Sequence, residues 1–340
     1  MPVTLNVEVV ENQIAVVGAG SWGTTVAHVV AKTAPTILWS RRRDLAEQIE
    51  KNHENVDYLA GVALSTSLRC SSVLQEVVAN ASIVMMAVPS NGYRDVAADV
   101  AGLVEGDVPI VSLAKGLERE TLQRMTEVTK ELMPLNPVAV LTGPNLAHEI
   151  LAGQPAATVV ACVDELVGKM IQKTISLPTL RVYTNSDVIG CEIAGVVKNV
   201  IAIAAGIVEG MGFGENSKAT LITRGLAEMS RLGVALGARP ETFMGLAGLG
   251  DVVATCASAK SRNTEVGRRL GRGENIGTIL ESMSMVAEGV RSSLSVLKLA
   301  EQSRVEMPIT EQVAAVCEGK TRAKDALVEL MARSSKSEFY

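Results

Sequence analysis

Histidine is rare in this 340-residue sequence, and its cysteines are not paired along the chain. There are three histidines, and none of the five cysteines belongs to a Cys-x-x-Cys motif. Structural zinc sites and disulfide frameworks need such residues clustered at short spacing. The sequence therefore predicts no metal site and no disulfides, and it offers little for a mechanism that depends on a histidine cluster.

An excess of positive charge is also missing. The formal net charge is -5 and the isoelectric point is near 5.5, which argues against a general nucleic-acid-binding surface. Residues 1–13 lack a basic start followed by a long apolar stretch, so no signal peptide is predicted and we expect a cytoplasmic protein. The apolar run at 193–208 is short for a membrane span and contains a lysine, so no integral membrane segment is expected.

Three glycines follow the first apolar run, in the segment IAVVGAGSWGTT. Residues 14–17 predict a buried strand and residues 21–32 a helix. Gly18, Gly20 and Gly23 then lie in the turn between them, which is the dinucleotide-binding fingerprint in its structural context. The first glycine suits a tight turn, the second leaves the backbone open to a pyrophosphate, and the third lets the helix lie close to the strand. We expect nucleotide phosphates at the positive end of this helix.

The N-terminal half repeats short apolar runs that are typical of buried parallel strands. Further strands are predicted at residues 36–39, 83–88, 109–114, 138–141, 157–162 and 180–184. Residues 44–80 are predicted as helix and loop. From residue 187 nearly every segment has apolar positions at helical spacing, with glycine-rich breaks near 210–214, 245–250 and 271–277. We predict an α/β protein with a Rossmann-type doubly wound N-terminal domain (1–188) and an all-α C-terminal domain (189–340).

Arginines follow the predicted second strand. Arg41, Arg42 and Arg43 come first, and the first acidic residue is Asp44. An NAD-selective site uses an Asp or Glu near this position to bind the ribose 2′-hydroxyl, whereas arginines bind the 2′-phosphate of NADP. We therefore predict NADP or NAD as the cofactor, with NADPH preferred. A solvated basic loop has the same composition and is the alternative.

A lysine and an asparagine interrupt the apolar helix predicted to begin near Ile189. The segment IAGVVKNVIAIAAGIV at 193–208 is otherwise apolar, and it is typical of the central helix of a second core. A buried lysine loses hydration, which lowers its pKa and makes Lys198 a candidate proton donor and acceptor. The alternative is a structural lysine that reaches the surface or pairs with a carboxylate.

Two segments after this helix carry residue types that a phosphorylated substrate needs. Asp251 and Thr255 are one helical turn apart, so they share a face if the segment is helical. Arg262 offers a bidentate phosphate ligand and Asn263 an amide donor. Each pattern alone is also typical of a helix cap or a surface charge. His148 is an alternative acid or base, since many hydroxy-acid dehydrogenases use a histidine.

Together these segments resemble the bacterial-type, soluble NAD(P)-dependent glycerol-3-phosphate dehydrogenases. The resemblance runs from about residue 14 to the 320s. Its motifs, in chain order, are GAGSWGT at 18–24, VPS at 88–90, AKG at 114–116, GPNLA at 143–147, VKNV at 197–200, TRGLAE at 223–228, AGLGD at 247–251, SRN at 261–263 and EMPI at 306–309. So many motifs in one order indicate a shared family rather than coincidence.

The resemblance implies reversible reduction of dihydroxyacetone phosphate to sn-glycerol 3-phosphate by hydride transfer from NAD(P)H, which would supply glycerophospholipid synthesis. The implied catalytic residues are Lys198, which transfers the proton, Asp251 and Thr255. The implied substrate contacts are Lys115, Gly143, Asn145, Lys198, Asp251, Ser261, Arg262 and Asn263. With the three glycines of the turn, the implied cofactor contacts are Ser21, Trp22, Arg41, Arg42, Lys115, Ala147, Arg262, Val286 and Glu288. The family often has Ser or Thr where this chain has Asn145, but an amide also donates hydrogen bonds.

Two other functions stay open on the sequence. A related dehydrogenase of the 6-phosphogluconate type, acting on a hydroxy acid or sugar acid, would also place Lys198 and Asn199 in a helix after the cofactor domain. A non-catalytic NADP(H)-binding redox sensor would need the glycine turn and the arginines but not the lysine. The expected partners are a small phosphorylated substrate and, because the second domain is apolar and helical, a second copy of the chain in a homodimer.

Overall fold

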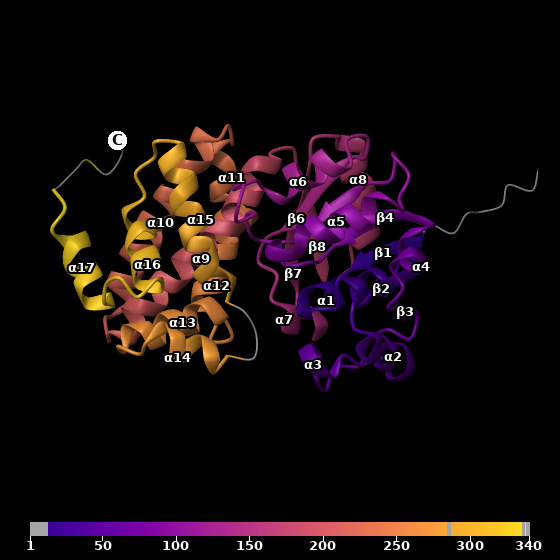
Figure 1. The fold of residues 1–340 in the computed structure, drawn as a ribbon, viewed down its shortest axis with the longest axis horizontal. Coiled ribbons are helices and arrows are strands. Elements are labelled where there is room, and N and C mark those ends of the chain that lie inside the picture. The colour runs from indigo at the N-terminus through magenta and orange to yellow at the C-terminus, as the bar shows by residue number, and fades with distance from the viewer. Residues whose placement is uncertain (1–12, 284–286, 335–336, 338–340) are drawn as a thin grey trace, which may run out of the picture.

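The computed structural model describes residues 13–283, 287–334 and 337, and Figure 1 shows a half built on a sheet beside a half built of helices. Among the described residues, eight strands form one sheet in the order β3-β2-β1-β4-β5-β6-β7-β8. The strands are β1 (Gln13–Val17), β2 (Thr36–Trp39), β3 (Leu68–Ser71), β4 (Ala81–Met86), β5 (Ile110–Ser112), β6 (Val138–Thr142), β7 (Ala156–Cys162) and β8 (Leu180–Asn185). The order from β3 to β6 is that of a doubly wound dinucleotide-binding fold, so the predicted fold class is confirmed.

Helices cover both faces of this sheet. They are α1 (Ser21–Val30), α2 (Arg43–Asn52), α3 (Val56–Leu59), α4 (Leu74–Val78), the short 3₁₀ turn η1 (Ser90–Gly92), α5 (Tyr93–Ala101), α6 (Met125–Leu132), α7 (Ala147–Leu151) and α8 (Glu165–Ile175). Side chains of α1, α2 and α8 form one buried core with the strands, and those of α4, α5 and α6 form a second. Burial on both faces explains why inner strands such as β1 and β4 are apolar rather than alternating.

Two details of the sheet differ from the sequence prediction. Strand β3 lies inside residues 44–80, where helix and loop were predicted, and it is a short edge strand that pairs only with β2. Its sequence, LRCS, alternates between buried and exposed positions and lacks the apolar run of an inner strand. Strand β7 runs antiparallel to β6, and β8 is parallel to β7, so the sheet is not parallel throughout.

The rest of the described chain is helical. Its elements are α9 (Val188–Gly210), α10 (Glu215–Ala235), α11 (Pro240–Met244), a π-helical turn η2 (Leu246–Gly250), α12 (Asp251–Ala257), α13 (Arg262–Gly271), α14 (Ile276–Glu281), α15 (Glu288–Gln302), α16 (Pro308–Cys317) and α17 (Ala323–Met331). The glycine-rich segment at 245–250, predicted as a break, is largely this π turn. Helix α9 is long and apolar enough to span a membrane, with a mean hydropathy of 1.8, but 89% of that stretch is buried within the protein. It is therefore the core helix of this half.

Helices α9 and α13 touch through glycines. A Cβ atom on Gly267 of α13 would lie 2.9 Å from the Cα of Gly206 on α9, closer than real Cβ contacts allow. Gly210 and Gly271 make the same kind of contact one turn further along. The backbones of the two helices therefore approach as closely as they can. The start of α13 is thereby held at a set position along α9.

Replacing Gly267 with Ala should destabilise the protein by about 1–3 kcal/mol, because the added methyl group forces the two helices apart. Urea unfolding followed by circular dichroism measures this change. The matched control is Gly102→Ala, because a Cβ there would meet only the carbonyl oxygen of Asp99, at 3.8 Å. Equal stability of the two variants would contradict the close contact between α9 and α13.

Candidate active site

The glycine turn has the geometry that a dinucleotide needs. Gly18 has a φ of +119°, and a Cβ on it would lie 2.7 Å from the carbonyl oxygen of Ala87 on the neighbouring strand end. A Cβ on Gly23 would lie 2.7 Å from the Cβ of Ala87. In front of Gly20 there is no atom within 4 Å of where a Cβ would be. The turn is thus tight where it meets the sheet and open where a pyrophosphate approaches.

At the start of α1, backbone N–H groups are available to a ligand. Gly20 precedes the helix and supplies no side-chain cap, and the first turn, from Ser21, contains no acidic residue. The buried Nε1 of Trp22 also has no hydrogen-bond partner among the described residues. Unsatisfied donors at a helix N-terminus favour an anion. These residues therefore fit the phosphates of a nicotinamide dinucleotide.

The predicted arginines lie at the end of β2, but they are not equivalent. Both Arg41 and Arg42 are exposed. Arg42 forms ion pairs with Asp57 and, at 3.4 Å, with Asp44. Arg41 forms no ion pair with the residues that the structure describes, so its guanidinium is the more available of the two for a 2′-phosphate.

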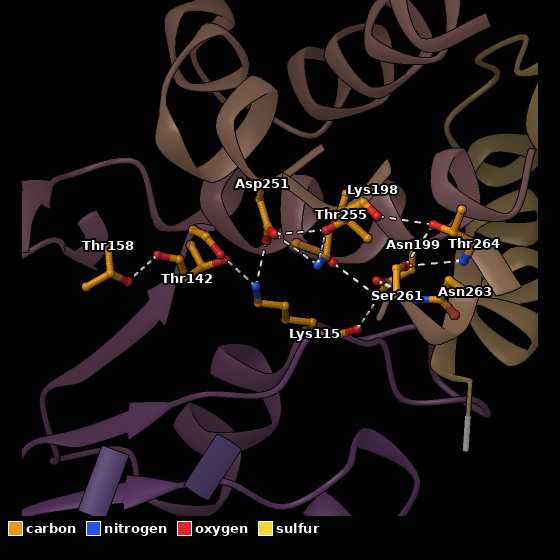
Figure 2. Close-up of polar contacts among 12 residues, drawn as sticks. Lys115, Thr142, Thr158, Lys198, Asn199, Asp251, Thr255, Ser261, Asn263 and Thr264 are labelled. Atoms are coloured by element: carbon orange, nitrogen blue, oxygen red, sulfur yellow. Dashed lines mark hydrogen bonds and ion pairs between the residues drawn. The ribbon is translucent and has the colours of Figure 1, made fainter. Parts of the chain in front are cut away.

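Two lysines from different halves of the chain share one buried carboxylate (Figure 2). Lys115, which follows β5, donates to Asp251 Oδ2 at 2.6 Å and to the carbonyl oxygen of Gly143 at 3.0 Å. Lys198 of α9 donates to Asp251 Oδ1 at 3.0 Å and to Thr255 Oγ1 at 2.9 Å. The sequence predicted all five of these residues, and the structure brings them together.

Burial and charge act against each other in this cluster. Asp251 is 2% exposed and Lys198 is 8% exposed. Burial and the positive charge of Lys198 together lower the pKa of Lys115 to about 8, although the Asp251 carboxylate opposes them. Burial alone would raise the pKa of the Asp251 carboxyl, but the two ammonium groups hold it below its usual range. Asp251 is therefore ionised at neutral pH.

A pair of asparagines joins the lysine cluster to α13 and α15. The amide of Asn263 donates to Asn199 Oδ1 at 2.9 Å and accepts from the backbone N–H of Gly289 at 3.0 Å. Asn199 in turn donates, at 3.4 Å, to the carbonyl oxygen of Lys115. The sequence predicted Asn263 as a site residue but not Asn199. The pattern that indicates Asn199 is its position beside Lys198 in an otherwise apolar helix.

A second residue that the sequence reasoning missed is Glu192, one of the few charged residues of α9. It is 6% exposed and accepts from Arg124 Nη1 at 2.7 Å and from the backbone N–H of Thr126 at 3.0 Å. These donors lie at the start of α6, in the half that contains the sheet. Glu192 therefore ties the helix that carries Lys198 to the segment that follows Lys115.

The chain matches two family descriptions. Residues 13–167 match "NAD-dependent glycerol-3-phosphate dehydrogenase N-terminus", and residues 187–328 match the C-terminus of the same enzyme. The chain belongs to the NAD-dependent glycerol-3-phosphate dehydrogenase family. The resemblance read from the motifs is thereby confirmed.

Full-length members of this glycerol-3-phosphate dehydrogenase family are close in sequence and structure. Glycerol-3-phosphate dehydrogenase [NAD(P)+] of Corynebacterium glutamicum is 50% identical over 329 residues, which cover 96% of this chain and 99% of that protein. Glycerol-3-phosphate dehydrogenase [NAD(P)+] 2 of Sphingopyxis alaskensis is 48% identical, covering 95% of this chain and 97% of that protein. The crystal structure of glycerol-3-phosphate dehydrogenase from Coxiella burnetii is 34% identical, with a TM-score of 0.91 over 95% of this chain and 100% of that one.

The remaining residues that the family resemblance implied lie around the cluster. Ser261 precedes α13 and accepts from the backbone N–H of Thr264 at 3.2 Å, and Arg262 is exposed at the first position of that helix. Glu288 begins α15, where burial raises the pKa of its carboxyl and the positive charge of Arg262 opposes the rise. Val286 lies outside the described residues.

The segment after β6 contains site residues that form few polar contacts with the rest of the described structure. Both polar atoms of the Asn145 side chain are buried without a hydrogen-bond partner among the described residues. Ala147 begins α7, and His148 lies exposed on the same helix. His148 is not part of the lysine cluster. Within the described ranges, no group of three or more His, Cys, Asp or Glu residues is arranged to hold a metal ion.

Proposed function

We propose that this chain catalyses the reversible reduction of dihydroxyacetone phosphate to sn-glycerol 3-phosphate with NAD(P)H. The observation that carries the proposal is the buried cluster in which Lys198 and Lys115 share Asp251. Lys115 and the glycine turn both follow strands at the same edge of the sheet, where ligands of doubly wound folds bind. The family to which the chain belongs is named for this activity.

Lys198 is the proposed proton donor in the direction of ketone reduction. The nicotinamide, when bound, supplies the hydride. An ammonium group has three N–H donors, and Lys198 uses two of them on Asp251 and Thr255. The third remains for the substrate oxygen on which negative charge develops. General acid catalysis of this kind contributes roughly 10²- to 10⁴-fold.

The charge of the cluster suits an anionic substrate. Two ammonium groups and one carboxylate leave a net charge of about one positive unit when both lysines are protonated. In a poorly hydrated site, fixed positive charge stabilises a developing oxyanion more than it does in water. Asp251 keeps both ammonium groups in place, so it is proposed as a catalytic residue that holds and orients Lys198.

The substrate phosphate is assigned to the start of α13. Ser261, Arg262 and Asn263 are the cap and the first two residues of that helix, where backbone dipoles favour an anion. Asn263 is tied through Asn199 to the cluster. Binding energy from the phosphate would thus position the reacting carbon beside Lys198. Asn145 is also assigned to the substrate, because its buried amide has no hydrogen-bond partner among the described residues.

Several finer proposals rest on the same evidence. The division into a cofactor domain ending at residue 188 and a helical substrate domain is supported by the last strand ending at Asn185 and α9 beginning at Val188. The exposed Arg41 supports a preference for NADPH. A role in glycerophospholipid synthesis, a cytoplasmic location and a homodimer are proposed from the family resemblance and from the composition of the chain.

Replacing Lys198 with Met should lower kcat by at least about 100-fold, since the proton donor is lost, while the affinity for the cofactor stays the same. Oxidation of NADPH by dihydroxyacetone phosphate, followed by absorbance, measures the rate. The matched control is Lys169→Met, because Lys169 is 59% exposed on α8, where it pairs with Glu165. Near-normal turnover of the Lys198 variant would remove this residue from the mechanism.

Exchanging Arg41 and Arg42 together for Gln should weaken NADPH binding at least about tenfold and change NADH binding much less, because only NADPH carries the 2′-phosphate. Fluorescence titration with each nucleotide gives both dissociation constants. Arg43→Gln is the control, since Arg43 begins α2 and pairs with Glu47. An equal loss of affinity for both nucleotides would refute recognition of the 2′-phosphate.

A further inference from the structure

Asp251 follows a π-helical turn, not a regular helix. In this turn, Leu246–Gly250, the backbone N–H of Gly250 donates to the carbonyl oxygen of Gly245 at 3.1 Å, five residues earlier. Each residue rotates an α-helix by about 100°, so the additional residue of a π turn decides which face of α12 carries Asp251. Such turns are frequent at functional sites because they re-aim side chains.

The turn rests on the backbone of Phe243. A Cβ on Gly248 would lie 2.5 Å from the Cα of Phe243, so the two backbones are in direct contact. Phe243 is 1% exposed, and its ring lies against Gly233 of α10, where a Cβ would meet Phe243 Cε2 at 2.7 Å. The ring of Phe243 therefore packs on a glycine of the long helix α10, and its backbone packs on a glycine of the π turn.

Phe243 belongs to the short helix α11, which is anchored to α9. Asp187, the residue that caps α9, accepts from the backbone N–H of Arg239 at 2.8 Å and from Thr242 Oγ1 at 2.6 Å. Phe243 is next in the chain, so its backbone is placed relative to the helix that carries Lys198. Gly245, Leu246 and Ala247, at the start of the turn, line a cavity of about 360 Å³ together with Arg239 and Thr242.

We propose that Phe243 is a positioning residue for Asp251, acting through the π turn. The contacts from α9 and α10 to Phe243, and from Phe243 to Gly248, place the carboxylate at 2.6 Å from Lys115 and 3.0 Å from Lys198. This inference rests on the proposed role of Asp251 in the reaction. Loss of the ring leaves the backbone of Phe243 and the turn that follows it free to shift, and the carboxylate free to move away from the two ammonium groups.

The test is Phe243→Leu, assayed with dihydroxyacetone phosphate and NADPH. A displacement of about 1 Å at a reacting group costs up to roughly 100-fold in rate, so kcat is expected to fall at least tenfold while KM for NADPH is unchanged. The matched control is Phe213→Leu, because Phe213 is 44% exposed and is expected to leave both constants as they are. A folded Phe243→Leu variant with the kcat of the unmodified enzyme would overturn the proposal.

A second variant, Phe243→Met, keeps the test decisive if Phe243→Leu does not fold, because methionine retains more of the buried volume while losing the rigid ring. Its kcat should also fall while KM for NADPH is unchanged. An unchanged kcat, or equal changes in kcat and KM for NADPH, would overturn the positioning role. Inactivity of the unmodified chain toward dihydroxyacetone phosphate would instead refute the proposed function.

Discussion

The structure depends on one carboxylate that two ammonium groups share. Asp251 and Lys198 come from the helical half, and Lys115 follows strand β5 of the sheet, so this cluster joins the two halves of the molecule. A buried carboxylate without a partner would be very costly, and so would two buried ammonium groups without one. Each member of the cluster therefore requires the others.

The scaffold around the cluster serves to keep these distances constant. Glycines bring α13 against α9, so the proposed phosphate site and the proposed proton donor are held on adjacent backbones. Glu192 fastens α9 to the start of α6, and the amides of Asn199 and Asn263 link α9 to α13. Rigid support of this kind is what an active site needs when its chemistry is mostly electrostatic, because preorganised charges pay no reorganisation cost during the reaction.

Sequence patterns predicted the local features well. The glycine turn is encoded within about ten residues, and the inner strands are apolar on both faces, so neither depends on distant parts of the chain for its recognition. Lys198 and Asp251 were predicted because a charge in an apolar helix and an acid after a glycine loop are both unusual. Strand β3 was missed because an edge strand of four residues, half of them polar, has no apolar run.

Features that depend on contacts between distant parts of the chain could not be predicted from local sequence patterns. The antiparallel direction of β7 is set by how the chain returns to the sheet after α7, and nothing within its seven residues encodes that direction. The π turn before Asp251 was predicted only as a glycine-rich break, because the segment that leads into it is anchored by Asp187, 55 residues away from Thr242 in the chain. Glu192 and Asn199 gave only the weak signal of polar residues in an apolar helix, and the partners that tie them to other elements lie 64 or more residues away in the chain.

The shared carboxylate is tested most directly by the pKa of Lys115, measured from the pH dependence of amine acylation at that residue with mass spectrometry. The pKa should be about 8 in the unmodified protein, well below the ordinary value of 10.5. In Asp251→Asn it should fall further, because burial and the charge of Lys198 then act without the opposing carboxylate. An ordinary lysine pKa in the unmodified protein, or the same value in both proteins, would contradict the account.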